Sequence, residues 1–462
     1  MINTASQIPS IPLPHREGQG GRSDLIIIGA GPGGYRAAEY AAKQGLKVVI
    51  FEGDNVGGTC LNVGCIPTKT YVHSASFAEA RERMAQVVTQ LRSGVEGILS
   101  HPNITLIREK ASFVNHGDSP CDSSEAEIIG TVPVIRVGTV PVIRAGEETY
   151  TAPHIIIATG SETKWLPIKG ARTDPRVVDS TGLLNLDTLP KRLCIIGAGV
   201  IGMEFASVFN RFGSEVTVIE YLKECLPALD SDIAKRLRKT LEKRGVTFKM
   251  KTAVQDLADI DADIILMATG RKPRTEGLDL EALGITLTPQ GAIPVDGNFR
   301  CVCGNAIATN GTIYAIGDVN GRQMLAHAAE KQAVRAVNHI LGKPDGIRFD
   351  IMPAAIFTEP EAACVGPTED QLKEQGVDYI CKKSFWRANG KALAMGETEG
   401  MLKLFVTPGG QILGCHAYGA HAADIVQEVS VLMCKHTTLS ELADMVHIHP
   451  TLSEILKSAA EN

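Results

Sequence analysis

Two cysteines five residues apart, Cys60 and Cys65, are the residues whose type and spacing most directly suggest chemistry. In a regular α-helix this spacing separates the Cα atoms by more than about 8 Å, whereas a disulfide needs roughly 4.4–6.8 Å. A bond between them would therefore require a distorted backbone. Gly64 permits such a distortion, and Pro67 favours it because its ring would clash with the Val63 carbonyl. A strained pair is easily reduced and suits a redox couple; two ordinary cysteines on a helix are the alternative.

A dinucleotide-binding unit is predicted directly before the cysteines. Residues 25–28 are four consecutive aliphatic residues, typical of a buried parallel strand, and they lead into the glycine-rich turn 29–34. A helix over 35–44 and a second strand over 47–51, which ends at Glu52, complete a βαβ unit. A glycine pattern alone is weak evidence, but here the strand, the helix and the terminal acid all accompany it.

Three glycines of this turn have an expected role. Gly29 makes the tight turn, Gly31 lets the backbone approach a pyrophosphate, and Gly34 lets the helix meet the strand. The helix N-terminus faces the phosphate charge. Glu52, about 20 residues on, is placed to bind a ribose hydroxyl.

The same pattern recurs from residue 193, which indicates an internal duplication with two dinucleotides. Glu220 ends the second strand of this unit, and a carboxylate there accepts the 2′-hydroxyl of NAD and repels the 2′-phosphate of NADP. NAD is therefore preferred. The candidate contacts of the second unit are Gly197, Ala198, Gly199, Val200, Ile201, Gly202 and Glu220, with Gly270 at the end of a later Ala-Thr-Gly turn.

The segment 57–69, with both units, resembles the redox motif of the pyridine nucleotide–disulfide oxidoreductases, and the likeness runs from about Asp24 to the C-terminus. The resemblance implies an α/β fold with two Rossmann-like dinucleotide-binding domains built on ββα-type sheets, followed by a C-terminal α+β dimerisation domain. The expected boundaries are a disordered tail over 1–22, an FAD-binding domain over 23–160 that is rejoined by 281–349, an NAD-binding domain over 161–280, and a dimerisation domain over 350–462.

The resemblance also implies site roles that spacing alone does not. FAD occupies the first unit, and Cys60 and Cys65 form its partner disulfide. Lys69 stands beside the flavin and pairs with Glu204 beside the nicotinamide, although a surface ion pair is the plain alternative. Three further flavin contacts are expected, at Ala111, Asp318 and the backbone of Ala326.

A histidine near the C-terminus is the expected base. Pro450 suits the first position of a helix, which would put His449 at the helix entry. Glu454, about one turn further, can fold back to orient the imidazole. The resemblance gives His449 the role of active base, reaching the disulfide from the other subunit of a homodimer.

The activity implied is oxidation of a protein-bound dihydrolipoyl group by NAD⁺ through FAD and the cysteine pair. The implied partner is a lipoyl-bearing acyltransferase of a 2-oxoacid dehydrogenase complex, or a glycine-cleavage carrier protein. The alternatives are an NAD(P)H-dependent glutathione-type or mercuric reductase, a flavin transhydrogenase, and a non-catalytic scaffold. Glu220 disfavours NADP, the mercuric enzyme's C-terminal cysteine pair is missing, and the cysteine–histidine–glutamate set disfavours the last two.

Composition excludes other classes. The 462 residues carry 44% hydrophobic and 21% charged residues and a net charge of −6, without the basic footprint of a nucleic-acid partner. No apolar run approaches the roughly 20 residues of a membrane span. Eleven cysteines, an odd count, suit a reducing cytoplasm. Cys301 and Cys303 lack a second pair at zinc spacing, so no metal is expected, and a local repeat over 130–144 receives no function.

Overall fold

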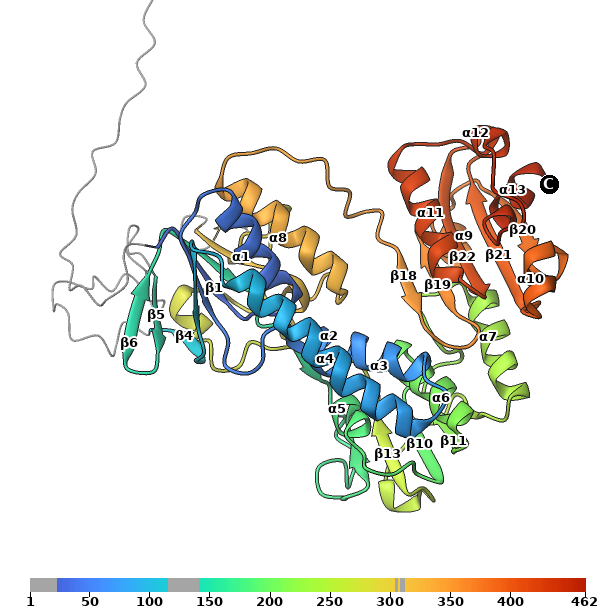
Figure 1. Cartoon of the computed structure of the whole chain (residues 1–462), viewed down its shortest axis with the longest axis horizontal. Coiled ribbons are helices and arrows are strands. Elements are labelled where there is room, and N and C mark those ends of the chain that lie inside the picture. Colours follow the sequence, from blue (N-terminus) through green and yellow to red (C-terminus); the bar gives the residue numbers. More distant parts are fainter. Residues whose placement is uncertain (1–22, 115–140, 304–305, 308–311) are drawn as a thin grey trace, which may run out of the picture.

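The computed structural model describes residues 23–114, 141–303, 306–307 and 312–462. The predicted tail 1–22 and most of the repeat 130–144 lie outside these ranges. Three five-stranded sheets organise the chain (Figure 1). The first is entirely parallel, in the order β17-β7-β1-β2-β3. Its strands are β1 Leu25–Ile28, β2 Val48–Phe51, β3 Ile104–Ile107, β7 His154–Ile157 and β17 Ile313–Ala315.

The second sheet repeats the first. It is also parallel, in the order β12-β11-β10-β13-β9, so β10 lies between β11 and β13 as β1 lies between β2 and β7. Its strands are β9 Val177–Val178, β10 Arg192–Ile196, β11 Glu215–Ile219, β12 Thr247–Lys249 and β13 Ile264–Met267. This confirms the predicted pair of Rossmann-like units.

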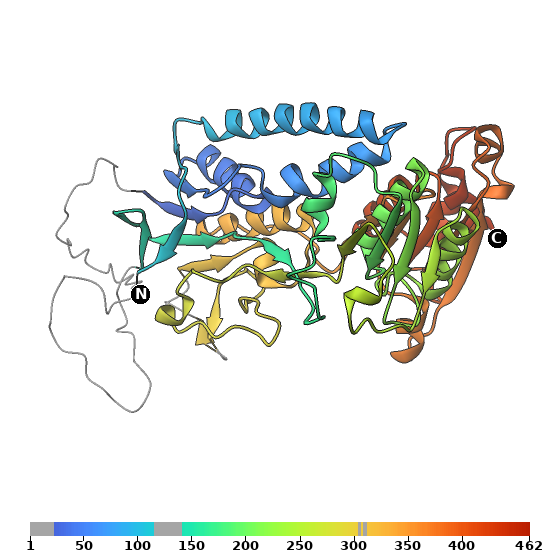
Figure 2. The same cartoon turned by 90° about the horizontal axis from the view of Figure 1, so that it is seen from below.

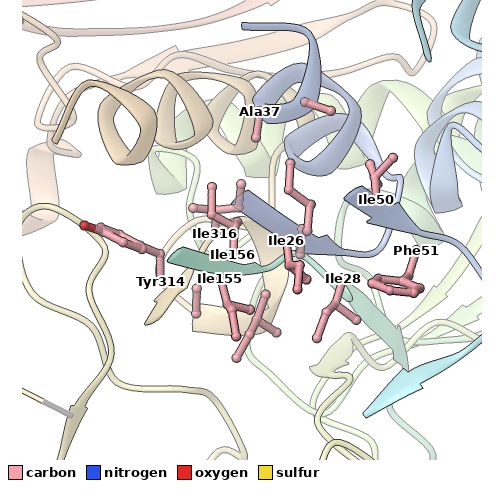
Figure 3. Packing of buried hydrophobic residues seen from close by; sticks show 14 of the residues in the cluster. Ile26, Ile28, Ala37, Ile50, Phe51, Ile155, Ile156, Tyr314 and Ile316 are labelled. Atoms are coloured by element: carbon pink, nitrogen blue, oxygen red, sulfur yellow. The ribbon is translucent and has the colours of Figure 1, made fainter. Parts of the chain in front are cut away.

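Helices cover the two parallel sheets, because strands buried on both faces need apolar partners on each side. Figure 3 shows Ile26 and Ile28 of β1 and Ile155 and Ile156 of β7 in this core, with Ala37 on the helix above. The helices over the first sheet are α1 Pro32–Lys43, α4 Phe77–Leu99 and α8 Ala326–Ile340, and those of the second unit are α5 Ser180–Leu184, α6 Val200–Phe212 and α7 Ser231–Lys243. In Figure 2, α4 runs lengthwise along one side of the molecule.

The third sheet is antiparallel, in the order β18-β19-β22-β21-β20, and with its helices it forms the predicted α+β domain. Its strands are β18 Ala354–Ile356, β19 Ala362–Val365, β20 Ile380–Phe385, β21 Gly400–Val406 and β22 Ile412–Gly419. Its helices are α9 Glu369–Glu374, α10 Gly390–Met395, α11 Ala422–Cys434, α12 Leu439–Asp444 and α13 Glu454–Glu461.

A buried ion cluster joins this domain to the second unit. Lys403 on β21 is 1% exposed, and its Nζ lies 2.7 Å from Asp230 Oδ1 and 2.5 Å from Glu369 Oε2. Asp230 is the N-cap of α7. Because removing one partner would leave a buried charge unpaired, the cluster holds the two domains in one arrangement.

The remaining elements are short. Redox helices α2 Gly58–Val63 and α3 Cys65–Val72 follow β2, and a three-stranded sheet contains β4 Ala111–Phe113, β5 Val142–Ala145 and β6 Glu148–Thr151. Two-stranded pairs are β8 Ser161–Thr163 with β14 Arg271–Pro273, and β15 Val302–Cys303 with β16 Ala306–Ile307. Short 3-10 helices span Leu257–Asp259, Leu280–Leu283, Gly317–Asn320 and Trp386–Ala388. Within the described ranges, no helix is both long and apolar enough to cross a membrane.

Candidate active site

A cavity of about 2070 Å³ lies where the three sheets meet, well above the roughly 300–1,000 Å³ of common small-molecule pockets. It therefore has room for more than one ligand. Its walls include both glycine turns, the redox helices and α11. The predicted residues that line it are Gly29, Gly31, Glu52, Cys60, Cys65, Lys69, Ala111, Gly199, Val200, Ile201, Glu204, Gly270, Asp318 and Ala326; those that do not are Gly34, Gly197, Ala198, Gly202, Glu220, His449 and Glu454.

The first and last glycines of each turn are required by close backbone contacts. Gly29 has φ +100°, and a Cβ atom there would lie 2.5 Å from the Ala158 carbonyl oxygen. A Cβ atom on Gly34 would lie 1.8 Å from the Gly29 carbonyl oxygen. Gly197 and Gly202 repeat both contacts, at 2.4 Å and 2.0 Å. Gly34 and Gly202 thus allow the helix to approach the strand, which explains why neither lines the cavity.

The N-termini of α1 and α6 open onto the cavity. Gly31 and Gly199 are their N-cap residues, and neither helix has a side-chain cap on its first N–H groups. Free N–H groups at the positive end of a helix dipole bind phosphate oxygens well. This pair of uncapped helix ends therefore fits the diphosphates of two dinucleotides.

Glu52 and Glu220 each accept a backbone hydrogen bond from the glycine turn of their own unit. Glu52 Oε2 accepts a hydrogen bond of 2.8 Å from the Ala30 N–H, and Glu220 Oε2 accepts one of 2.7 Å from the Ala198 N–H. The second oxygen of each carboxylate accepts a backbone N–H two residues further on. Because a carboxylate offers about four acceptor positions, a ribose hydroxyl can still be bound. The sequence had suggested only the ribose role.

The redox segment is broken between its two cysteines, as the distortion argument required. Helix α2 ends at Val63, α3 begins at Cys65, and Gly64 between them has a non-helical backbone. A Cβ atom on Gly64 would lie 2.9 Å from the Thr59 carbonyl oxygen. Cys60 and Cys65 are both free thiols, and both line the cavity.

The two thiols differ in acidity. The pKa of the Cys65 thiol is lowered to about 7, chiefly by the hydrogen bond from Cys60, which outweighs burial, and with help from the Lys69 ammonium. The same hydrogen bond raises the pKa of the Cys60 thiol, and burial raises it further. These opposite pKa shifts favour the proton on Cys60 and the negative charge on Cys65.

Lys69 and Glu204 form a close pair beside Cys65. Lys69 Nζ lies 2.9 Å from both Glu204 carboxylate oxygens and 4.7 Å from the centre of the Phe357 ring. Glu204 is 3% exposed and also accepts the Phe357 N–H at 2.9 Å. This pair differs from a surface ion pair, because its carboxylate is buried and oriented by a second donor.

Asn62, which the sequence reasoning missed, fastens the redox helix to the preceding loop. Its Nδ2 donates to the carbonyls of Val56 and Gly58 at 3.0 and 2.9 Å, and its Oδ1 accepts from Arg92 Nε and Nη2 at 2.9 and 2.7 Å. Arg92 lies on α4, 30 residues away. The amide thus links the cysteine-bearing helix to the long helix behind it.

Replacing Asn62 with alanine is expected to lower the free energy of unfolding by about 1–3 kcal/mol, because buried carbonyls and a guanidinium lose their partner. Asn55→Ala is the control, since it removes a side-chain bond to the exposed Asp54 and keeps the Asn55 carbonyl that accepts from Asn62 Nδ2 at 3.4 Å. Thermal denaturation measures the stability, and amide hydrogen exchange over 55–64 should accelerate in the Asn62 variant alone. Equal exchange in both variants would contradict the proposed fastening.

The sequence reasoning also missed Ser161 and Arg271, which surround Asp318. Ser161 Oγ donates to Asp318 Oδ2 at 2.5 Å, and Arg271 donates to Ser161 through Nε at 2.7 Å and Nη2 at 2.6 Å. All three residues line the cavity. The only sequence signal was their position directly after the two Ala-Thr-Gly turns.

His449 and Glu454 form a pair away from the cavity. His449 Nδ1 lies 2.9 Å from Glu454 Oε1, and the imidazole is 78% exposed. The predicted helix entry is wrong: α13 begins at Glu454, not at Pro450, because Glu454 Oε2 accepts the Thr451 N–H and closes a turn before the helix. In Figure 1, α13 lies well apart from α2 and α3, and neither His449 nor Glu454 lines the cavity that Cys60 and Cys65 line.

The comparisons with known proteins agree with this site. A pyridine nucleotide-disulphide oxidoreductase model matches residues 23–333, and the dimerisation-domain model of the same family matches residues 352–460. The chain belongs to this family. Mitochondrial dihydrolipoyl dehydrogenase of Pisum sativum is 36% identical over 95% of this chain and 91% of its own, and dihydrolipoyl dehydrogenase of Geobacillus stearothermophilus is 35% identical over 95% and 96%.

A solved structure supports the same assignment. The HOCl-induced flavoprotein disulfide reductase RclA from Escherichia coli superimposes with a TM-score of 0.83 at 32% identity, over 95% of this chain and 99% of that one. As a pyridine nucleotide–disulfide oxidoreductase the chain is a flavoprotein enzyme that uses FAD and NAD(H), which confirms the predicted cofactors. The two uncapped helix ends at the cavity fit both dinucleotides.

Proposed function

We propose that this protein oxidises protein-bound dihydrolipoyl groups to lipoyl groups and reduces NAD⁺ to NADH, with Cys60 and Cys65 as the redox pair. The observation that carries the proposal is the placement of Cys60 and Cys65 in the cavity wall, on helices that break at Gly64, with the Lys69–Glu204 pair in the same wall. Cys60 keeps the proton and exchanges with the substrate, whereas Cys65 keeps the charge beside Lys69. The relatives named dihydrolipoyl dehydrogenase, which cover 95% of the chain, support this substrate.

The exchange begins with the oxidised pair. A base takes the proton of one substrate thiol, because only the thiolate attacks a disulfide well. The thiolate bonds to the Cys60 sulfur and releases Cys65 as a thiolate. The second substrate sulfur, also deprotonated, attacks the first and releases Cys60 as the lipoyl disulfide forms, so the protein pair has gained two electrons. FAD, when bound, carries those two electrons from the cysteine pair to NAD⁺.

We propose that His449 is the base and that it acts from the partner subunit of a homodimer. The imidazole is exposed, and Glu454 holds its Nδ1, which leaves Nε2 free to take the thiol proton. The residues before it, Val446 and Ile448, are 100% and 79% exposed. Such exposed apolar side chains beside a base suit a surface that a second subunit covers.

The domain boundaries, the partner and the compartment are proposed on the same grounds. The FAD domain is placed at 23–160 with 281–349, the NAD domain at 161–280 and the dimerisation domain at 350–462. The lipoyl group belongs to an acyltransferase of a 2-oxoacid dehydrogenase complex or to a glycine-cleavage carrier. The nine cysteines whose side chains are described are free thiols, which suits the reducing cytoplasm as the compartment.

The charge on Cys65 predicts a pH-dependent spectrum. In the two-electron-reduced protein, a long-wavelength thiolate–flavin band should appear as the pH rises through about 7 and vanish below it, because the lowered pKa of Cys65 sets the thiolate fraction. Lys69→Met removes a cation and should move the midpoint upward, whereas Glu204→Gln removes an anion and should move it downward. Shifts of the same sign in both variants would contradict this electrostatic assignment.

A disulfide reductase with another substrate is the second candidate, because RclA matches this chain with a TM-score of 0.83. Turnover of lipoamide and of glutathione, each measured with NADH and with NADPH, separates the two. The proposal expects lipoamide with NADH to be the fastest pair. Faster turnover of glutathione, or a preference for NADPH, would refute it.

A further inference from the structure

A short ribbon carries the chain between the two dinucleotide-binding units. Strand β8 leads from the first parallel sheet to the second, β14 leads back, and the two pair antiparallel. Each follows an Ala-Thr-Gly turn, at 158–160 and 268–270. The orientation of one unit relative to the other therefore depends on these two crossings.

Equivalent hydrogen bonds, one set at each Ala-Thr-Gly turn, close the two ends of the ribbon. Thr159 Oγ1 donates to the Arg274 carbonyl at 2.7 Å, and Thr269 Oγ1 donates to the Lys164 carbonyl at 2.6 Å. The backbone adds Arg274 N–H to the Gly160 carbonyl at 2.9 Å and a matching bond at the other crossing. Both crossings are thus fixed at each end, which makes the ribbon a rigid frame.

Arg271 and Ser161 of this frame both line the cavity. Arg271 Nε donates to Ser161 Oγ, which occupies a lone pair of the hydroxyl and commits its single proton to Asp318 Oδ2. Asp318 Oδ1 forms no hydrogen bond within the described part of the chain, so it is available as an acceptor at the cavity wall. The 3-10 helix of Asp318 packs directly on β14.

Burial and the neighbouring polar groups act on the pKa of Asp318 in opposite directions. Burial raises the pKa of its carboxyl, while the Ser161 hydrogen bond and the Arg271 charge lower it. Arg271 is the charged group that acts on Asp318; Arg271 itself faces Arg274, Asp179 and Cys65. Burial lowers the pKa of Arg271, yet a guanidinium stays protonated. A permanent cation therefore offsets the burial of the carboxylate.

We propose that Arg271 and Ser161 are positioning residues that hold Asp318 ionised and oriented as a hydrogen-bond acceptor for a hydroxyl of the bound flavin. Both residues belong to the ribbon that joins the two units, so the same strands fix the flavin contact and connect the units. This inference rests on the proposed use of FAD and on the expectation from the sequence that Asp318, which lines the cavity, contacts the flavin. It does not depend on which thiol the enzyme oxidises.

The test measures FAD affinity as a function of pH, by the fluorescence of released flavin, for Ser161→Ala, Arg271→Gln, Arg271→Lys and the double variant. Lys272→Gln is the matched control, because Lys272 is the next residue of β14, does not line the cavity and pairs with the half-buried Glu162 at 2.8 Å. In Arg271→Gln the loss of FAD affinity at acid pH should begin roughly one pH unit higher than in the wild type, since an adjacent cation stabilises the carboxylate by that order. Lys272→Gln should follow the wild type.

The other variants separate charge from geometry. Arg271→Lys keeps the cation and should restore the acid limit, but its single ammonium should leave affinity below the wild type. Ser161→Ala should bind FAD roughly tenfold more weakly, with a smaller upward shift of the acid limit. The double variant should lose less affinity than the product of the single losses, because the two residues act in one chain.

Two outcomes would overturn the inference. In the first, Arg271→Gln and Ser161→Ala show the acid limit of the wild type; in the second, their losses multiply fully. If wild-type protein fails to oxidise dihydrolipoamide while these FAD effects appear, the substrate proposal fails and the positioning role stands. If dihydrolipoamide is oxidised but the acid limits coincide, the reverse holds.

Discussion

Replacing Cys60 with serine is expected to abolish oxidation of dihydrolipoamide, because no sulfur remains to form the mixed disulfide and a hydroxyl cannot replace it. The fall should exceed about 10⁴-fold, the upper range for loss of a group that acts in the reacting step. Steady-state reduction of NAD⁺ by dihydrolipoamide measures it. Flavin content should be unchanged, since Cys60 lies in α2 and the uncapped helix ends α1 and α6 are untouched.

NADH-dependent reduction of a one-electron acceptor such as ferricyanide is the control for this variant. That route uses the nicotinamide and flavin alone, so it should persist in Cys60→Ser. Cys65→Ser should likewise lose dihydrolipoamide turnover and should also lose the thiolate–flavin band, because the charge resides on Cys65. Substantial turnover of dihydrolipoamide by Cys60→Ser would remove the cysteine pair from the mechanism.

Replacing His449 with glutamine is expected to lower dihydrolipoamide turnover by roughly 10²–10⁴-fold, the usual contribution of a positioned general base. Glutamine keeps a polar side chain of similar reach but cannot take the proton. Glu454→Gln should give a smaller loss in the same assay, because it weakens the support of His449 Nδ1 without removing the imidazole. Binding of FAD should be unaffected in both variants, since neither residue lines the cavity.

Mixed dimers decide whether the base comes from the partner. His449→Gln and Cys60→Ser homodimers should each be nearly inactive. In a heterodimer of the two, one site combines an intact Cys60 with an intact partner histidine, so random mixing should restore roughly a quarter of wild-type turnover. No recovery after verified subunit exchange, or a fully active monomer in sedimentation, would mean that the site is not shared.

The last glycine of each turn and the break at Gly64 were predictable from the sequence, because both depend on contacts between near neighbours in the chain. A Cβ atom on Gly34 meets the Gly29 carbonyl and one on Gly64 meets the Thr59 carbonyl, each five residues away, whereas one on Gly29 meets the distant Ala158. Steric exclusion at such short separation leaves few backbone conformations. The Lys69–Glu204 pair also appeared in advance, although only through resemblance to a family.

The supports of these residues were not predictable. Asn62 meets Arg92 across 30 residues, and Ser161 meets Asp318 across 157. The start of α13 was predicted wrongly because a local rule for proline at position 450 was overridden. Leu452 and Ile455 pack into the core of the dimerisation domain, and Glu454 closes the turn before them.

The sequence by itself determined two dinucleotide-binding units, a redox cysteine pair and a histidine–glutamate pair, since each is written in neighbouring residues whose sterics and hydrogen bonding act locally. Only the tertiary structure decided what fastens the redox helix to α4, what holds Asp318, and where α13 begins. Those outcomes depend on burial and on charges brought together by packing. Residue order along the chain does not record such distances.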